Sequence, residues 1–535
     1  SFSRRIRSRS RTRCGWSPPL SLLLEDNKRQ SFGFAFFMSL IYIIFIELIY
    51  FLGTCMSNAY QLIWFRQDLR IHDHAALWHA SQQGPSLGLV ILSPEQWKQH
   101  ADAPIKISFY LRQLRTLQKE LSALHIPLVI QVIPYWKEIA TFISDFSKKY
   151  NIENVYANIE IGVNELKRDK TVQDYLNRHG KELFLFHDRT IFPLRSIRNQ
   201  SQQPYQVFSA FKKACYTKLD TSGLPQCYPV PNKQNEVPLD FLQGKNIDLD
   251  EIEKLFCSSL SKEQQDLWPV GEQYALEQLD QFIEQSVCHY KVERDFPHIQ
   301  ATSKLSPYLN IGILSIRQCL QALFRNQHGN FHLVNEGQQT WLDELLWREF
   351  YQHILFDFPH VSKHIPFKKD TQKIKWNHNP EHLTAWQMGQ TGIPIVDAGM
   401  RQLLQTGWMH NRVRMITAMF LCKNLLIDWR IGEQWFMRHL IDGDLAANNG
   451  GWQWCASTGT DAVPYFRIFN PIAQSKKFDP EGEYIRQWVK ELAHLDNKTI
   501  HEPYSSKTDL GLNYPKPIVN LKETRLKAIE TFKNI

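Results

Sequence analysis

The sequence lacks the short cysteine and glycine spacings that are typical of many metal and nucleotide sites. Its nine cysteines contain no Cys-x-x-Cys pair and no close spacing suited to zinc, which favours a reducing compartment and predicts no bound metal. No Gly-x-Gly-x-x-Gly follows the first expected strand, so a dinucleotide at the usual place of a doubly wound sheet is not indicated. The body of the chain also has no internal repeat and no low-complexity tract.

A large excess of charge of one sign is absent as well. Among 535 residues, 62 Lys and Arg stand against 54 Asp and Glu, so the net charge is 62 − 54 = +8. Residues 1–55 contribute 8 − 3 = +5 of this, which leaves 54 − 51 = +3 for the rest of the chain. Net charge alone therefore does not predict binding to nucleic acid. The length and the 43% apolar content predict two to four globular domains.

The first 55 residues differ in composition from the rest. Six arginines between Arg4 and Arg13 precede an apolar stretch over 32–55 whose only charge is Glu47, long enough to cross a bilayer. Met56 and the residues after it are typical of an ordinary soluble start. We interpret residues 1–55 as a non-fold leader, with mis-joined upstream sequence, a membrane anchor and a transit peptide as the alternatives. No membrane contact is expected for the body.

Strand-like and helical patterns alternate from Tyr60 onward. Short apolar runs over 60–65, 87–92, 127–133, 154–158 and 183–186 are separated by helical patterns such as those over 107–124 and 136–150. This order predicts βαβ units and a parallel, doubly wound, Rossmann-like sheet. Residues 189–265 are polar and rich in turns, and after about Trp268 helical patterns dominate. We therefore expect an α/β domain over 57–188, a linker over 189–265 and an all-α domain over 266–525.

Three segments of the helical part could carry chemistry, although each also has a purely structural interpretation. The hydroxyls and ammonium of 302–306 precede an apolar helix, as in a phosphate site or simply a helix cap. Trp341, Glu344 and Arg348 share one helix face, which fits either a site or an ordinary amphipathic helix. Asp442-Gly-Asp444 lacks the later Glu that an EF-hand requires, so we expect no metal there.

Taken together, these segments resemble the photolyase/cryptochrome superfamily. The resemblance runs from Tyr60 to about Lys527, begins with the run Trp64-Phe-Arg-Gln-Asp-Leu-Arg70, and is most specific over 452–470. The most similar branch is the bacterial class I cyclobutane pyrimidine dimer (deoxyribodipyrimidine) photolyases. The resemblance implies a light-driven lyase in which excited reduced FAD gives one electron to a flipped-out dimer, the ring opens, and the electron returns.

The resemblance also assigns residues to the FAD that such proteins hold in their helical domain. Hydroxyls and cations suit the phosphates, and an amide at flavin N5 suits several protonation states. The implied cofactor residues are Tyr290, Thr302, Ser303, Lys304, Leu305, Ser306, Trp341, Arg348, Arg414, Asp442, Gly443 and Asp444, with Asn448 facing N5. An electron-transfer chain is implied through Trp452, nearest the flavin, then Trp429, then Trp376 at the surface.

The lesion pocket distinguishes branches of the superfamily. Glu344, Trp347, Asn411, Met415 and Trp454 match the dimer-repairing enzymes, in which Glu344 would hydrogen-bond the dimer in its protonated form. The (6-4) photolyases carry proton-donating histidines where this chain has Asn411 and Met415, so dimer repair is the implied reaction.

Two further sites are implied by the same resemblance. Arg294, Arg412, Arg467 and Lys477 match or neighbour a basic rim that contacts DNA phosphates. Asn164, Glu165 and Lys363 match positions that contact an antenna chromophore, 5,10-methenyltetrahydrofolate, although Ser362 departs from an expected cysteine. A deazaflavin antenna is the alternative.

The main rival function is a cryptochrome-type blue-light receptor, which shares the fold and FAD. Such receptors commonly extend into a long C-terminal tail, whereas this chain ends at Ile535 and has Glu344 and Trp454. A second rival is a repair enzyme confined to single-stranded DNA. The expected partner is damaged DNA, bound by a monomer with no obligate protein partner, in a bacterial cytoplasm with access to the chromosome.

Overall fold

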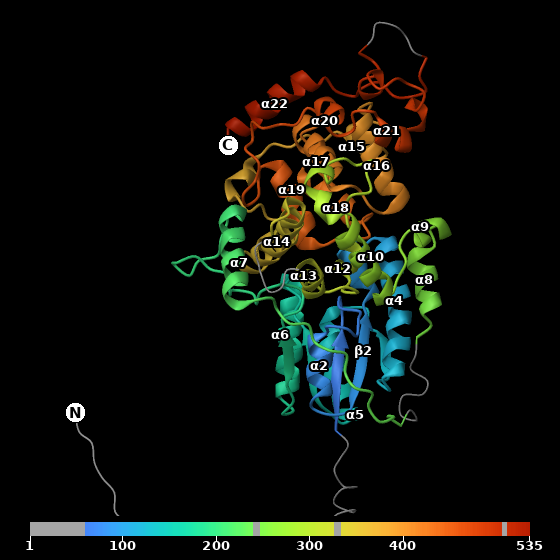
Figure 1. Cartoon of the computed structure of the whole chain (residues 1–535), viewed down its shortest axis with the longest axis vertical. Coiled ribbons are helices and arrows are strands. Elements are labelled where there is room, and N and C mark those ends of the chain that lie inside the picture. The colour runs from blue at the N-terminus through green and yellow to red at the C-terminus, as the bar shows by residue number, and fades with distance from the viewer. Residues whose placement is uncertain (1–58, 239–246, 326–332, 506–510) are drawn as a thin grey trace, which may run out of the picture. The chain divides into compact units, whose positions relative to one another are not determined.

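The computed structural model describes residues 59–238, 247–325, 333–505 and 511–535 (Figure 1). The leader predicted over residues 1–55 lies outside these ranges. None of the helices within them combines the length and the apolar character needed to cross a bilayer.

A five-stranded parallel sheet forms the centre of the N-terminal region, as the sequence predicts. Its strands are β1 (Tyr60–Phe65), β2 (Ser86–Leu92), β3 (Leu128–Val132), β4 (Ile152–Asn158) and β5 (Leu183–Phe186), in the order β3-β2-β1-β4-β5. The helices around it are α2 (Ala75–Ser81), α3 (Pro94–Gln99), α4 (Pro104–Ala123), α5 (Ile139–Lys149) and α6 (Val163–Asn177). Strand β1 sits at the topological switch point, from which the sheet grows in both directions.

The sheet is covered on both faces, and the side chains of β1 show this alternation. Ile63 and Phe65 belong to an apolar cluster with α4, whereas Leu62 and Trp64 belong to a second cluster with α5 and α6. Successive strand residues point to opposite faces. A strand buried on both faces must be apolar throughout, which explains the near-continuous apolar run of β1.

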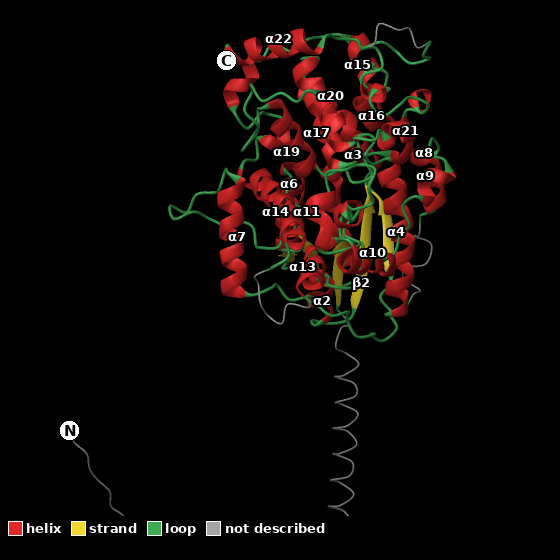
Figure 2. Ribbon diagram, turned by 45° about the horizontal axis from the view of Figure 1, so that its top comes forward, coloured by secondary structure: helices red, strands yellow, loops and turns green. Residues whose placement is uncertain are grey.

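Helices make up the C-terminal region, confirming the second half of the predicted fold class (Figure 2). They are α10 (Glu272–Gln285), α11 (Tyr290–Glu293), α12 (Ser306–Asn310), α13 (Ile316–Phe324), α14 (Glu336–Asp357), α15 (Pro380–Gln387), α16 (Pro394–Thr406), α17 (Asn411–Met419), α18 (Trp429–Met437), α19 (Leu445–Ala456), α20 (Pro471–Phe478), α21 (Glu483–Trp488) and α22 (Leu521–Lys533). The last helix continues past residue 525, where the sequence-based boundary was placed.

The segment interpreted as a linker contains helices of its own. These are α7 (Phe208–Ser222) and α8 (Leu249–Cys257), followed by α9 (Lys262–Asp266). Helix α7 packs against α14, and its Lys212 and Tyr216 both donate to the Asp343 carboxylate. This segment is thus part of the packed helical layer rather than only a surface connection.

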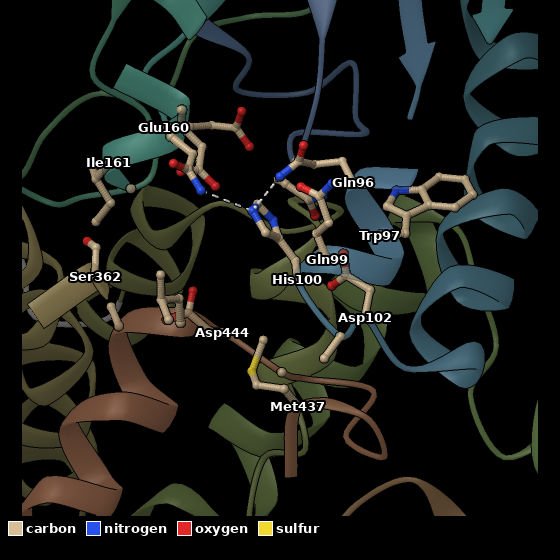
Figure 3. A pocket seen from close by; sticks show the side chains of 18 of the residues that line it. Gln96, Trp97, Gln99, His100, Asp102, Glu160, Ile161, Ser362, Met437 and Asp444 are labelled. Atoms are coloured by element: carbon tan, nitrogen blue, oxygen red, sulfur yellow. Dashed lines mark hydrogen bonds between the residues drawn. The ribbon is translucent and has the colours of Figure 1, made fainter. Parts of the chain in front are cut away.

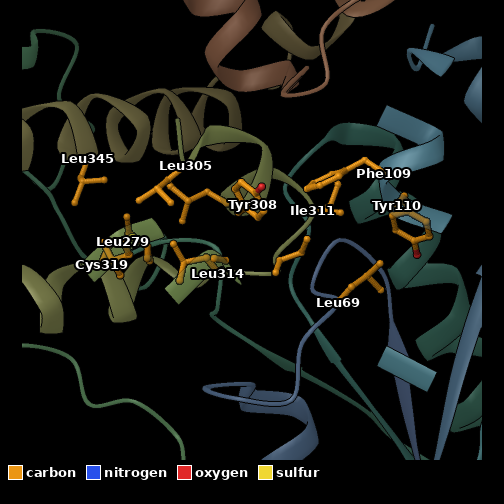
Figure 4. Packing of buried hydrophobic residues seen from close by; sticks show 14 of the residues in the cluster. Leu69, Phe109, Tyr110, Leu279, Leu305, Tyr308, Ile311, Leu314, Cys319 and Leu345 are labelled. Atoms are coloured by element: carbon orange, nitrogen blue, oxygen red, sulfur yellow. The ribbon is translucent and has the colours of Figure 1, made fainter. Parts of the chain in front are cut away.

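One apolar core joins the sheet region to the helical region. Phe109 of α4 meets Tyr308 of α12 edge to face at 5.3 Å, and the surrounding side chains come from both regions (Figure 4). Gly312 allows the close approach, because a Cβ there would lie 2.4 Å from the Gln67 carbonyl oxygen. Its φ of +71° is also one that L side chains rarely adopt.

A buried network of charges lies across the same boundary. Asp188, just after β5, accepts from Arg70 at 2.6 Å and from Arg317 of α13 at 2.7 Å, and Arg317 also contacts Asp73 at 2.9 Å. Burial alone would raise the pKa of Asp188, but Arg70 and Arg317 hold it well below its usual range. The carboxylate is therefore charged at neutral pH and fixes α13 against the sheet.

We expect Asp188→Asn to lower the free energy of unfolding by about 3–5 kcal/mol at neutral pH, because two buried guanidiniums lose their shared partner. Since the pKa of Asp188 is depressed, this difference should be complete above about pH 4, the carboxyl's unfolded value, and should shrink as the pH falls below it. Chemical denaturation measures both effects. The matched control is Asp174→Asn in the exposed pair with Lys170. If both variants lost the same free energy of unfolding, the buried network would not contribute the expected stability.

Candidate functional site

Three of the predicted cofactor residues meet between α12, α17 and the loop before α19. Ser306 donates to Asp442 at 2.6 Å, and the guanidinium of Arg414 reaches the same carboxylate at 2.9 Å. Asp442 is therefore a shared acceptor that orients one hydroxyl and one cation. The predicted helix after Ser306 is only the five-residue α12, so the hydroxyls of 302–306 act individually rather than through a long helix dipole.

Excess positive charge distinguishes the neighbouring cluster. Asp444, the N-cap of α19, accepts from Arg189 and from Gln352, and Arg348 donates to the Arg189 carbonyl at 2.7 Å. Burial alone would raise the pKa of Asp444, but Arg189 and Arg348 lower it to about 2. Burial and the nearby Arg189 lower the pKa of Arg348. Two guanidiniums against one carboxylate leave one positive charge, which suits an anionic group such as a diphosphate.

Two aromatic residues assigned to the cofactor form the apolar wall of this region. Trp341 of α14 and Tyr290 of α11 are buried, and both pack on Phe282 of α10, at 5.1 and 5.7 Å between ring centroids. The loop before α12 contains Thr302, Ser303 and Leu305. Lys304 of the same loop is exposed and donates to Gln300. Among the predicted loop residues, Lys304 thus binds a neighbouring amide.

Helix α19 presents an open face next to these groups. Asn448 donates to the Glu433 carbonyl at 3.0 Å, which fixes its amide, and Gly451 lies one turn later on the same side. A Cβ added at Gly451 would meet no atom within 4 Å, whereas one at Gly450 would lie 2.2 Å from the Tyr351 ring. The open space beside an oriented amide and a surplus cation fits a flat, phosphate-bearing cofactor such as FAD.

Two tryptophans of the predicted relay are buried in one apolar cluster, and the third, Trp376, is partly exposed at its edge. Trp452 and Trp429 are buried in this cluster, and Trp376 is partly exposed and packed against it. Trp452 meets the ring of Phe436 at 4.9 Å, and Trp376 meets Phe532 of α22 at 6.0 Å. This placement is consistent with a path from the interior to the surface.

The predicted lesion residues lie on three helices that pack together. Glu344 and Trp347 lie on α14, Asn411 and Met415 on α17, and Trp454 on α19, and α19 contacts both other helices. All five side chains are at least partly exposed, and we refer to this predicted set of five residues as the lesion pocket.

Phe208 occupies one face of Trp347. The two rings stack with 3.6 Å between centroids and 12° between planes, so Trp347 can offer only its other face to a ligand. The Phe208 amide donates to Asp461 at 3.0 Å, which ties the start of α7 to the loop after α19. A residue from the presumed linker thus supports the pocket.

Glu344 and Arg294, assigned to lesion and to DNA respectively, are paired with each other. Their side chains form an ion pair at 2.5 Å. The protonated Glu344 that the resemblance implies stays a prediction. Among the other rim residues, Arg412 pairs with Asp295 at 2.8 Å, while Arg467 and Lys477 are exposed.

The three residues assigned to an antenna chromophore line one cavity of about 780 Å³ (Figure 3). Asn164 and Glu165 come from the start of α6, and Lys363 from the turn after α14. Burial, and secondly the nearby Glu160, raise the pKa of Glu165. The hydroxyl of Ser362, also on the wall, is buried without a hydrogen-bond partner among the described residues.

The same cavity shows residues that the sequence analysis missed. His100 lies 2.7 Å from the Gln96 amide and 3.5 Å from that of Asn164, as the dashed lines in Figure 3 indicate. Asp444 lines the cavity too, so one of the predicted cofactor residues faces the same cavity as the predicted antenna residues. Helical spacing after Arg348 could have indicated Gln352, but no local pattern pointed to Arg189, Phe208 or His100.

Comparison with known families gives two matches. Residues 61–232 match the model described as DNA photolyase, and residues 341–534 match the model described as FAD binding domain of DNA photolyase. The two models correspond to the sheet region and to most of the helical region.

Individual proteins resemble the chain over nearly its whole body. Proteins named deoxyribodipyrimidine photo-lyase from Buchnera aphidicola and Escherichia coli are each 42% identical over 88% of this chain, covering 96% and 98% of their own length. Among solved structures, a bacterial class III photolyase from Agrobacterium tumefaciens is 33% identical with a TM-score of 0.78, over 90% of this chain and 98% of its own. A Synechocystis cryptochrome is 28% identical with a TM-score of 0.73, over 89% of this chain and 100% of its own.

Two neighbouring glycines of α19 test the cofactor position. We expect Gly451→Ala to raise the stability of the flavin-free protein by up to ~1 kcal/mol through helix propensity, yet to reduce bound FAD, because its methyl group enters the open space. Gly450→Ala should instead destabilise the protein by collision with Tyr351. Thermal unfolding and flavin absorbance per protein measure both. Unchanged FAD retention in Gly451→Ala would place the cofactor elsewhere.

Proposed function

Because this chain belongs to the DNA photolyase family, we propose that it uses light to split cyclobutane pyrimidine dimers in DNA. The observation that carries this proposal is the pocket of Glu344, Trp347, Asn411, Met415 and Trp454 beside the FAD-binding region. FAD in its reduced form, when bound, supplies the electron that ring opening requires once light is absorbed. The chain's own residues bind and orient the cofactor and the extruded bases, and they shield both from water.

Binding of the cofactor is the task of the charged cluster. Arg348 and Arg189 provide the surplus positive charge for the diphosphate, with Ser306 as a hydroxyl donor beside it. Arg414 and Asp442 fix each other, so their remaining donor and acceptor positions are held in place. Asn448, held by the Glu433 carbonyl, would present its amide oxygen to the flavin edge.

The lesion pocket provides flat apolar surfaces and a few polar contacts. Trp347, supported from behind by Phe208, and Trp454 would hold the extruded bases between rings. Flipping costs least for bases whose pairing and stacking the lesion has already weakened. Asn411 and Glu344 would hydrogen-bond the base edges, Glu344 in its protonated form. Met415 fills the gap between helices with an adaptable side chain.

Trp452, Trp429 and Trp376 would carry an electron from the surface toward the cofactor. Their shared apolar cluster excludes water from the first two rings, and the partial exposure of Trp376 gives an external donor access to the last. This role keeps the cofactor in the state that repair needs and is separate from repair itself.

We propose a second, light-gathering chromophore in the cavity next to Asp444. Burial and the nearby Glu160 raise the pKa of Glu165, and Asn164 and His100 add further polar groups to the same wall. This set suits a flat heterocycle with several hydrogen-bonding edges, such as a folate, and Lys363 could meet an acidic tail. A deazaflavin is the competing occupant.

A cryptochrome-type receptor is the alternative function, favoured only by the fold it shares. The cryptochrome is 28% identical, whereas the proteins named photo-lyase reach 42%, and the chain has the complete set of lesion-pocket residues. We propose the cytoplasm of a bacterium, with access to the chromosome, as the location of the protein. Its proposed partner is damaged DNA, bound by a monomer without an obligate protein partner.

Light-dependent repair tests the main proposal. We expect the chain from Met56 to remove dimers from DNA in light and not in the dark. Glu344→Ala should keep its FAD and lose most of the repair yield per absorbed photon, because the reduced dimer loses a hydrogen bond. Absorbance and dimer counting measure these quantities. No repair by the unaltered protein, or equal yield in the variant, would contradict the proposal.

The absorption spectrum tests the antenna. We expect the purified protein to show a near-ultraviolet band beyond that of FAD, and Glu165→Ala to lose this band while the FAD bands remain. Glu182→Ala, at an exposed glutamate after α6, is the matched control. The spectrum of the released chromophore separates a folate from a deazaflavin. Retention of the band in Glu165→Ala would place the chromophore outside this cavity.

A further inference from the structure

The arginines nearest the lesion pocket are neutralised by carboxylates of the pocket itself. Arg294 pairs with Glu344 at 2.5 Å, and Arg412 pairs with Asp295 at 2.8 Å. Arg294 also lies 3.8 Å from the Asp295 carboxylate. These four side chains carry no net charge together. They are 18% to 31% exposed, so the pairs lie at the mouth of the pocket and not in the core.

Aromatic rings hold both guanidiniums in position. Arg294 lies over the ring of Tyr290 at 5.3 Å, and Arg412 lies over that of Phe478 at 4.4 Å. A guanidinium stacked on a ring loses less freedom when it later binds another anion. The arginines are thus ready to bind phosphate, but their charge is already satisfied.

We propose that Glu344 masks Arg294 in the free protein and releases it when a dimer enters the pocket, so that a phosphate contact becomes available only on damaged DNA. This inference rests on the proposed function, because it requires a base to engage Glu344. Undamaged DNA offers no extruded base, so the ion pair persists and one phosphate contact is withheld. A flipped dimer takes up the hydrogen-bonding capacity of Glu344, and Arg294 turns to the backbone phosphate beside it.

The mask would increase selectivity without strengthening binding. Phosphate contacts normally act on every sequence alike, because the backbone is the same everywhere. A contact that depends on Glu344 instead favours the lesion, since it weakens binding to undamaged DNA relative to damaged DNA. Asp295 pairs with Arg412 in the free protein, but it contacts no base in the proposed complex, so entry of a dimer does not release Arg412.

Salt dependence of DNA affinity counts the phosphate contacts and therefore tests the mask. For duplex DNA the slope of log affinity against log salt changes by about 0.9 for each contact. We expect the unaltered protein to show a steeper slope, by about 0.9, on dimer-containing duplex than on the same duplex without damage. In Glu344→Gln the slope on undamaged duplex should steepen by about 0.9, and the difference between the two duplexes should vanish.

Glu95→Gln is the matched control, because it makes the same chemical change in an exposed pair with Lys98 on α3. It should leave both slopes unchanged, which separates a local contact from the change in total charge. Asp295→Asn provides a second variant that should also steepen the slope on undamaged duplex. FAD absorbance confirms that each variant is folded and loaded.

The outcomes distinguish this inference from the proposed function. If the unaltered protein repairs dimers but Glu344→Gln and Asp295→Asn leave the slope on undamaged duplex unchanged, the mask is wrong and the function stands. If the unaltered protein shows neither repair nor a preference for dimers, the function itself fails. A slope on undamaged duplex that steepens equally in Glu95→Gln would also overturn the mask.

Discussion

The short segment that follows β5 fixes where the helices lie over the sheet, and the candidate sites depend on it. Asp188 takes hydrogen bonds from Arg70 and Arg317, and the next residue, Arg189, reaches Asp444 at the start of α19. The amides of Ile191 and Phe192 both donate to Glu349, a fully buried carboxylate on α14, at 2.8 and 3.0 Å. Buried charges must be paired, so this geometry tolerates little displacement.

This arrangement explains why residues predicted for two different sites meet at one cavity. The antenna cavity is lined by the start of α6 from the sheet region and by Asp444 from the helical region. Asp444 also receives Arg189, which leaves the sheet one residue after the buried network. A chromophore in the cavity would therefore lie next to the cofactor cluster, and energy would have a short distance to travel. The rigid segment, rather than a direct contact between chromophores, sets that distance.

Paired charge recurs at the mouth of the lesion pocket, where its consequence differs. In the interior, Arg189 and Arg348 exceed their carboxylate partner and leave a positive charge for an anionic group. At the surface, Arg294 and Arg412 are each balanced, so the opening of the pocket is electrically neutral. The inner arginines therefore attract the anionic cofactor strongly. The attraction of the outer arginines for DNA phosphates can depend on what enters the pocket.

The sequence by itself determined the fold class and the family, and it predicted residues for each site. The strand-like runs over 60–65 and 183–186 correspond to β1 and β5, because a doubly covered parallel sheet needs continuous apolar strands. Motifs such as 452–470 are local, so they identify the family without any knowledge of distances in the fold.

Tertiary structure alone decided the pairing of Glu344 with Arg294, the stacking of Phe208 on Trp347 and the ion pair of Arg189 with Asp444. These contacts join residues separated by 50, 139 and 255 positions. Charge pairing and ring stacking between distant residues depend on how elements pack, and no local pattern in the chain records that packing.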